Sequence, residues 1–146
     1  MTDDNEFMTA ALGYAAQGLH VFPVKPKAKA PLTKNGFKDA SIDTAKIIEW
    51  WTQWPDANIG IATGKVSGLF VVDIDGEYPS DWPSLPPATV VKTGRGFHHY
   101  YEYPQGQDIP SKTKLNKQSV DIQSDGKYVV APPSIHPTGG RYEFIA

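Results

Sequence analysis

Apolar residues recur at spacings of three and four along two segments of the chain, which is typical of amphipathic helices. The first segment covers residues 5–19, with an acidic residue in its first turn and Gly18 as a stop signal. The second covers residues 41–54, where Ser41 or Asp43 is the candidate N-cap and a following proline ends the pattern. We therefore expect two helices, both in the N-terminal half of the chain.

The second predicted helix carries an apolar stripe that includes three of the four tryptophans. Tryptophans this close together could stack on nucleic-acid bases. An aromatic stripe on an amphipathic helix more often packs inward, so we interpret it as part of the core. The stripe consists of Ile47, Trp50, Trp51 and Trp54.

Short apolar or alternating runs bounded by glycine and proline predict strands between and after the helices. Two pairs of runs are separated by glycine turns, which predicts one hairpin over residues 88–103 and another over residues 119–131. A last turn within residues 138–144 leads into one more strand. The other predicted strands cover residues 20–24, 58–64, 67–76, 88–93, 97–103, 119–123 and 127–131.

Composition excludes several classes of protein. The 146 residues are 40% hydrophobic, enough for one core, so we expect a single domain over residues 1–146. The sequence has no cysteine, which excludes disulfide frameworks, thiolate metal sites and cysteine nucleophiles. No run approaches the roughly 20 apolar residues of a membrane span. The first six residues include three acids and no Lys or Arg, whereas a signal peptide begins with basic residues, so we expect a cytoplasmic protein without a membrane partner.

The formal net charge of −2 conceals an uneven distribution of charged residues. An evenly spread negative charge would argue against binding to nucleic acid, because phosphate neutralisation requires Lys and Arg. Residues 39–81 hold eight acids and two lysines, whereas lysines cluster at residues 25–38 and 112–117. These lysine-rich loops are either solvated linkers or contacts for a polyanion. The candidate DNA-binding residues are Lys29, Lys34, Lys112 and Lys114.

Three carboxylates are candidate metal ligands. Asp73 and Asp75 lie two apart in a predicted strand, so both side chains project from the same face. Asp121 lies in another apolar strand, where an unpaired carboxylate would be costly to bury. Carboxylate oxygens suit Mg²⁺ or Mn²⁺, ions that also recruit phosphate oxygens. The alternatives are that the first two cap a strand end and that a lysine or arginine compensates Asp121.

A turn followed by two histidines is the candidate phosphate-binding segment. Thr93, Arg95 and Gly96 belong to this turn, which could offer backbone amides and a guanidinium to phosphate, or could simply close a hairpin. His98 and His99 occupy successive strand positions and therefore face opposite sides of the sheet. Alternation alone does not decide which of them lines a site. No Walker-type phosphate loop occurs in the sequence.

Seven motifs, taken in order, identify a resemblance that covers nearly the whole chain. They lie at residues 21–24, 29–31, 58–64, 67–76, 93–101, 120–134 and 135–142. This ordered set resembles the bifunctional DNA primase/polymerase (prim-pol) domain of the archaeo-eukaryotic primase superfamily, found in plasmid and phage replication proteins. The resemblance implies an α+β fold in which an α/β unit packs against an RRM-like, mostly antiparallel sheet. It also implies an active site in the cleft between these two units.

The resemblance assigns roles to the candidate residues. It implies that Asp73 and Asp75 are the first-motif metal ligands and that Asp121 is the third-motif acid. It places the second-motif histidine, which contacts the phosphates of the incoming nucleotide, on His98, with Arg95 able to share that contact. The implied reaction is attack of a primer 3′-hydroxyl on the α-phosphate of a dNTP or NTP, directed by a DNA template and assisted by Mg²⁺ or Mn²⁺.

Two departures from the family limit what the resemblance implies. Without cysteine, the zinc element of some relatives cannot form, and the sequence ends shortly after the last motif. We therefore expect primer elongation rather than de novo priming. We also expect this chain to be one domain of a larger replication protein that includes a helicase domain. A catalytically silent nucleic-acid-binding module is the main alternative. A metal-dependent sugar-nucleotide transferase is a further one, because such enzymes also use Asp-x-Asp.

Overall fold

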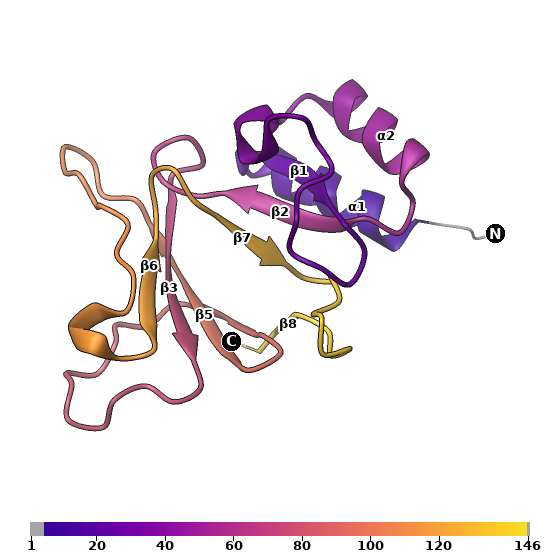
Figure 1. Ribbon diagram of the computed structural model, residues 1–146. Helices are drawn as coiled ribbons and strands as arrows, with labels where there is room; N and C mark the ends of the chain where they lie inside the picture. Colours follow the sequence, from indigo (N-terminus) through magenta and orange to yellow (C-terminus); the bar gives the residue numbers. More distant parts are fainter. Residues whose placement is uncertain (1–4, 146) are drawn as a thin grey trace.

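The computed structural model describes residues 5–145 and contains two antiparallel sheets and two α-helices (Figure 1). The fold is therefore α+β, as expected. Most of the acidic start of the sequence, from which we predicted that there is no signal peptide, lies outside the described residues. Among the described residues, neither helix is long and apolar enough to cross a membrane.

Side-chain caps define the starts of both helices. In α1 (Glu6–Ala16), the side chain of Asn5 accepts a hydrogen bond from the amide of Met8. In α2 (Thr44–Gln53), Asp43 accepts from the amide of Ala45, so Asp43 rather than Ser41 is the N-cap. The tryptophan stripe of α2 packs inward, and Trp51 is completely buried. The interpretation of this stripe as core is confirmed.

The helices cover a three-stranded sheet with the order β1-β2-β7. Its strands have continuous apolar sequences because they are buried along almost their whole length. Gly60 in the central strand lies against the ring of Phe22, where a Cβ atom would come within 2.6 Å of the ring carbons. The strands are β1 (Val21–Val24), β2 (Asn58–Ala62) and β7 (Tyr128–Ala131).

The second sheet has five strands in the order β6-β3-β5-β4-β8, and all its neighbours are antiparallel. One face packs into the core shared with the three-stranded sheet, and the other packs against a small apolar cluster under the loop at residues 78–87. Two short 3₁₀-helices, η1 (Gly36–Asp39) and η2 (Leu115–Lys117), lie in the loops. The strands are β3 (Leu69–Asp75), β4 (Thr89–Lys92), β5 (Gly96–Glu102), β6 (Val120–Gln123) and β8 (Glu143–Phe144).

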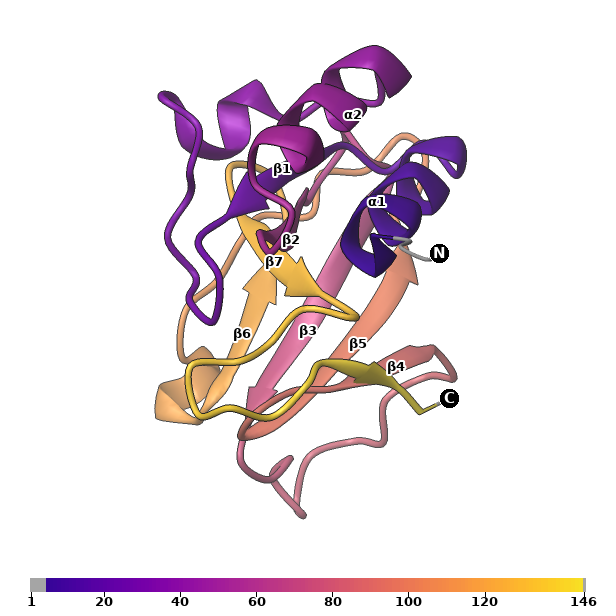
Figure 2. The same cartoon turned by 90° about the vertical axis from the view of Figure 1, so that its right-hand side faces the viewer.

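One of the two predicted hairpins is wrong. The hairpin β4–β5 forms, but β6 pairs with β3 and β7 pairs with β2, so the turn at residues 124–126 carries the chain from one sheet to the other. Hydrogen bonds from elsewhere hold this turn: the Thr63 hydroxyl donates to the carbonyl of Ser124, and the Thr63 amide donates to that of Lys127. Figure 2 shows β6 beside β3 and β7 beside β2.

Candidate active site

Three of the predicted site residues form a row across neighbouring strands. Asp121 on β6 is directly opposite Asp73 on β3, which is directly opposite His98 on β5. Residues directly opposite each other in an antiparallel sheet have Cα atoms roughly 4.5 to 5.5 Å apart. Asp75 lies two residues farther along β3, on the same face and opposite Gly96. The sheet register therefore brings the three carboxylates and one histidine together.

Asp73 is the central member of the row. Its Oδ1 lies 3.4 Å from Nε2 of His98, and its Oδ2 accepts a hydrogen bond of 3.2 Å from the side chain of Gln123. Burial favours the neutral carboxyl, but the interactions with His98, Gln123 and the positive charge of Lys29 outweigh it and lower the pKa of Asp73. The site therefore holds a carboxylate anion at its centre.

The other two carboxylates differ in their surroundings. Asp121 accepts a hydrogen bond of 2.6 Å from the backbone amide of Lys114, a residue in the left-handed conformation with φ of 49°. Asp75 is exposed at the strand end, and no hydrogen bond among residues 5–145 uses its carboxylate. One oxygen of Asp121 therefore has a backbone donor, which was not considered from the sequence.

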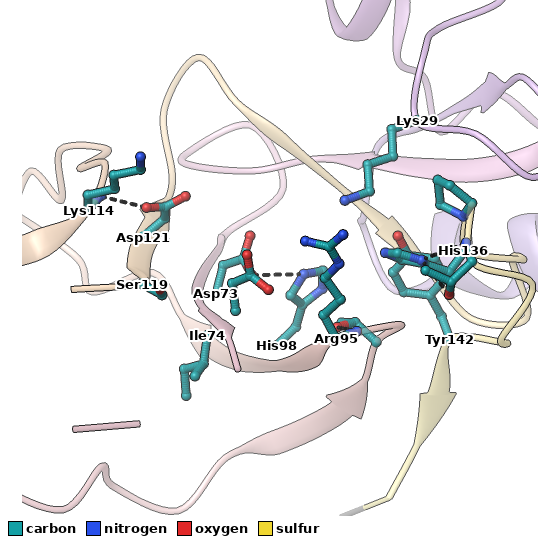
Figure 3. Close-up of a pocket in the computed structure, with 14 residues that line it drawn as sticks. Lys29, Asp73, Ile74, Arg95, His98, Lys114, Ser119, Asp121, His136 and Tyr142 are labelled. Atoms are coloured by element: carbon teal, nitrogen blue, oxygen red, sulfur yellow. Dashed lines mark hydrogen bonds and ion pairs between the residues drawn. The ribbon is translucent and has the colours of Figure 1, made fainter. Parts of the chain in front are cut away.

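Two loops of the other half of the molecule supply the opposite wall of a cavity of about 580 Å³. Lys29 comes from the loop after β1, and His136, Thr138 and Tyr142 come from the segment between β7 and β8. Figure 3 shows Lys29 and the side chain of Arg95 between Asp73 and His136. The carboxylates thus face a wall of cationic and hydrogen-bond-donating groups across one pocket.

The glycine turn before β5 lies partly in this pocket. Thr93 and Arg95 line the pocket, whereas Gly96 does not. The amide of Gly96 donates to the hydroxyl of Thr93 at 2.9 Å, so it is used within the turn and is not presented to a ligand. A Cβ atom on Gly96 would lie 1.8 Å from the carbonyl oxygen of Ile74, so close strand pairing requires glycine at this position.

A comparison with protein families matches residues 11–146 to the N-terminal domain of bifunctional DNA primase/polymerases (Prim-Pol). The chain belongs to this family. A search of curated proteins finds no match. Membership in the Prim-Pol family indicates a DNA primase/polymerase that transfers nucleotides, and it confirms the resemblance read from the ordered motifs.

Prim-Pol proteins are typically metal-dependent, so the carboxylates need to be tested as ligands. Within the described part of the chain, no three acidic, His or Cys side chains converge as a formed metal site. The chemistry of the donor set nevertheless fits Mg²⁺ or Mn²⁺, because Asp73, Asp75 and Asp121 present carboxylate oxygens along one wall. These three residues are the ones that could hold such an ion.

The candidate DNA-binding lysines of this Prim-Pol domain divide into two pairs. Lys29 and Lys114 line the pocket. Lys34 and Lys112 are exposed and lie outside the pocket lining. The first pair is therefore placed to contact a ligand inside the pocket. The second pair could contact only a ligand that extends beyond the pocket.

Several residues that line the pocket or bond to its lining segments were not among those predicted from the sequence. Gln123 lies two residues after Asp121 in the same strand and therefore projects from the same face, which was a usable signal. His136 lies in a segment rich in proline and glycine, where periodicity gives no direction for a side chain. Its only sequence signal was its place in the last of the ordered motifs. Asn58, at the start of β2, reads as an ordinary strand residue and gave no signal at all.

Proposed function

We propose that this domain is a template-directed nucleotidyltransferase that extends a primer on a DNA template with dNTPs or NTPs. The observation that carries the proposal is one pocket with carboxylates on one wall and cationic donors on the other. Such a pairing suits phosphoryl transfer, because cationic groups stabilise the phosphates while the carboxylates would hold a metal ion that stabilises charge on the attacking and leaving oxygens. Membership in the Prim-Pol family supports the same reaction class.

In the proposed reaction, the primer 3′-oxygen attacks the α-phosphorus of the nucleotide. A new phosphorus–oxygen bond forms, the bond to the β-phosphate bridging oxygen breaks, pyrophosphate leaves, and the hydroxyl proton passes to solvent. Arg95 and His98 would bind and orient the phosphates, and Thr93 would fix the turn that carries Arg95. Asp73, Asp75 and Asp121 would hold Mg²⁺ or Mn²⁺, which when bound stabilises charge on the attacking and leaving oxygens.

The proposed partners follow from this reaction. A DNA template and primer would reach the pocket from the lysine-bearing loops, with Lys29 and Lys114 in the pocket and Lys34 and Lys112 outside it. We propose that the setting is plasmid- or phage-type replication in the cytoplasm, with a helicase domain as a partner in the full-length protein. Elongation of existing primers is the expected activity, and de novo priming is tested alongside it.

The test is primer extension by variants that remove one carboxylate charge each. Asp73→Asn and Asp121→Asn should lower the extension rate at least about 100-fold, because the lost charge stabilisation amounts to several kcal/mol. Asp81→Asn is the matched control, since Asp81 is an exposed carboxylate in the loop outside the pocket. The assay uses labelled dNTPs or NTPs with Mg²⁺ or Mn²⁺ on a primed template, with circular dichroism as the check on folding.

Other outcomes separate the alternatives. Full extension by both pocket variants would contradict the assigned carboxylates. DNA binding by the wild type without any extension would favour a silent binding module, and template-independent hydrolysis of a sugar nucleotide would favour a sugar-nucleotide transferase. An unprimed template run in parallel distinguishes a primase from an elongating polymerase.

A further inference from the structure

His136 is a buried histidine to which the proposed reaction gives no role. Its side chain lies on the wall of the pocket opposite Asp73, in the segment between β7 and β8 (Figure 3). It is only 6% exposed, although the segment around it is an irregular loop. A buried polar side chain in a loop requires hydrogen-bond partners, and those of His136 are informative.

The hydrogen bonds of His136 fix which ring nitrogen carries the proton. Nδ1 accepts from the backbone amide of Thr138 at 3.1 Å and lies 2.9 Å from the hydroxyl of the same residue. A backbone amide can only donate, so Nδ1 must offer its lone pair, and the neutral ring carries its hydrogen on Nε2. No hydrogen bond within residues 5–145 uses Nε2, which leaves a donor for a ligand.

Burial and the surrounding positive charges favour the neutral form of the His136 ring. Burial lowers the pKa of His136, and the positive charges of Lys29 and Arg95 lower it further. His98 acts in the same direction, and Asp75 is the one group that opposes the shift. A neutral ring retains the Nδ1 lone pair that accepts from Thr138, so the donor on Nε2 keeps its orientation.

The backbone and ring of His136 are held by its own segment and by the turn before β5. The His136 amide donates to the carbonyl of Gly140 at 2.7 Å, and the ring of Tyr142 lies 5.6 Å away between centroids. Gly94, from the turn before β5, packs against the ring so closely that a Cβ atom there would lie 2.2 Å from Nδ1. The imidazole therefore has little freedom to turn away from the pocket.

Asn58 fixes the loop of His136 to the loop of Lys29. Its side chain is buried, donates to the carbonyls of Ala28 at 3.1 Å and Ile135 at 2.8 Å, and accepts from the amide of Ile135 at 2.9 Å. Each bonded residue immediately precedes a pocket residue, Lys29 in one loop and His136 in the other. The side chain of Asn58 thus fixes the positions of Lys29 and His136 relative to each other on the same wall of the pocket.

We propose that His136 binds the phosphate chain of the nucleotide through its Nε2–H, beside the charges of Lys29 and Arg95. The inference rests on the proposed function, since it takes the nucleotide as the ligand of this pocket. A phosphate chain needs several convergent donors. The pocket provides the ammonium of Lys29 and the oriented imidazole of His136 on one wall, and the guanidinium of Arg95 from the turn before β5. His136 is accordingly a binding residue, and Thr138 and Asn58 are the residues that position it.

The test measures binding of inorganic tripolyphosphate by isothermal titration calorimetry. His136→Ala should weaken the affinity about tenfold, the loss expected from one hydrogen bond to a charged acceptor. His136→Gln should lose much less, because its amide nitrogen can donate from nearly the position of Nε2. His99→Gln is the matched control and should bind as the wild type does, because His99 projects from the other face of β5.

The outcomes for His136 and for the polymerase proposal are separable. Wild-type affinity in His136→Ala, or a loss in His99→Gln as large as that in His136→Ala, would overturn the role of His136 even if the wild type extends primers. A wild type that does not bind tripolyphosphate would also overturn it. If binding depends on His136 but the wild type neither extends nor initiates primers, this inference stands and the polymerase proposal fails.

Discussion

His99 is adjacent to His98 in sequence but lies in a different environment. Its side chain projects from the face of β5 away from the pocket, where its cross-strand neighbours are Val72 and Val90. Its Nδ1 is buried and has no hydrogen-bond partner among the described residues. Burial, and secondarily the charge of His98, lower the pKa of His99, so the folded protein resists protonating it.

This lowered pKa predicts a loss of stability in acid. Below about pH 6.5 the unfolded chain binds a proton at His99 that the folded state resists, so the free energy of unfolding falls as the pH falls. His99→Gln removes this contribution and should therefore lose less stability than the wild type between about pH 7.5 and 5.5. Urea denaturation at both pH values measures the difference. Identical losses in the two proteins would contradict the prediction.

The residues of the candidate site were predictable where strand periodicity applies and not elsewhere. Asp73 and Asp75 share a face because they are two apart in a strand, and that spacing is visible in the sequence. The proximity of Asp121 to Asp73 depends on which strands pair, which alternation does not encode. Asp121 became a candidate because a carboxylate is costly to bury in an apolar strand, and the resemblance added its third-motif role. The sheet register supplies what neither gave, its position directly opposite Asp73.

At the scale of elements, Asn58 links β2 to two loops. Replacing its side chain leaves two carbonyls and one amide in a buried region without their partners. Asn58→Ala should therefore lower the free energy of unfolding by at least about 2 kcal/mol. Chemical denaturation measures this loss, and hydrogen exchange at the amide of Ile135 should become faster.

An exposed asparagine provides the control for this prediction. Within the described residues, the side chain of Asn35 bonds only to the nearby Asp39, and both residues belong to a surface turn. Asn35→Ala should change the free energy of unfolding by less than about 0.5 kcal/mol, as is usual for surface substitutions. Similar losses in the two variants would show that Asn58 does not act through its buried hydrogen bonds.

Elements that depend on local sequence signals were predicted well, whereas the pairing of strands was predicted less well. Both helices were predictable because caps and apolar stripes are local features. The β6–β7 hairpin was predicted wrongly because a Ser-Asp-Gly turn between two strands normally closes a hairpin. Here Thr63 bonds the turn from a distant part of the chain, and each strand pairs in a different sheet. Such nonlocal bonds leave no pattern in the sequence.

At the scale of the whole molecule, one core joins the two sheets, whereas acidic and basic residues gather in different parts of the sequence. The buried core includes strands of both sheets and both helices. The net charge of −2 is the sum of acids concentrated in the middle of the chain and lysines in flanking loops. Binding of a polyanion should therefore depend on a few local lysines and should be sensitive to salt.

Lys34 and Lys112 test this dependence because they lie outside the pocket. Alanine at either position should weaken binding to a primed template and reduce the slope of log affinity against log salt by roughly 1. Affinity for tripolyphosphate should not change, since neither residue lines the pocket. Fluorescence anisotropy over a range of KCl concentrations measures the slope, with Lys46→Ala on α2 as the control. Unchanged slopes for both variants would exclude these lysines from the DNA contact.

The row of Asp121, Asp73 and His98 has a consequence for how sequences of this kind can vary. Its spacing comes from the hydrogen-bond ladder between β6, β3 and β5, so changes of core side chains leave it intact. Inserting or deleting one residue in any of these strands would turn the following side chains to the other face. The arrangement of these three side chains is therefore tolerant of substitution in the strands around it and intolerant of any change in their length.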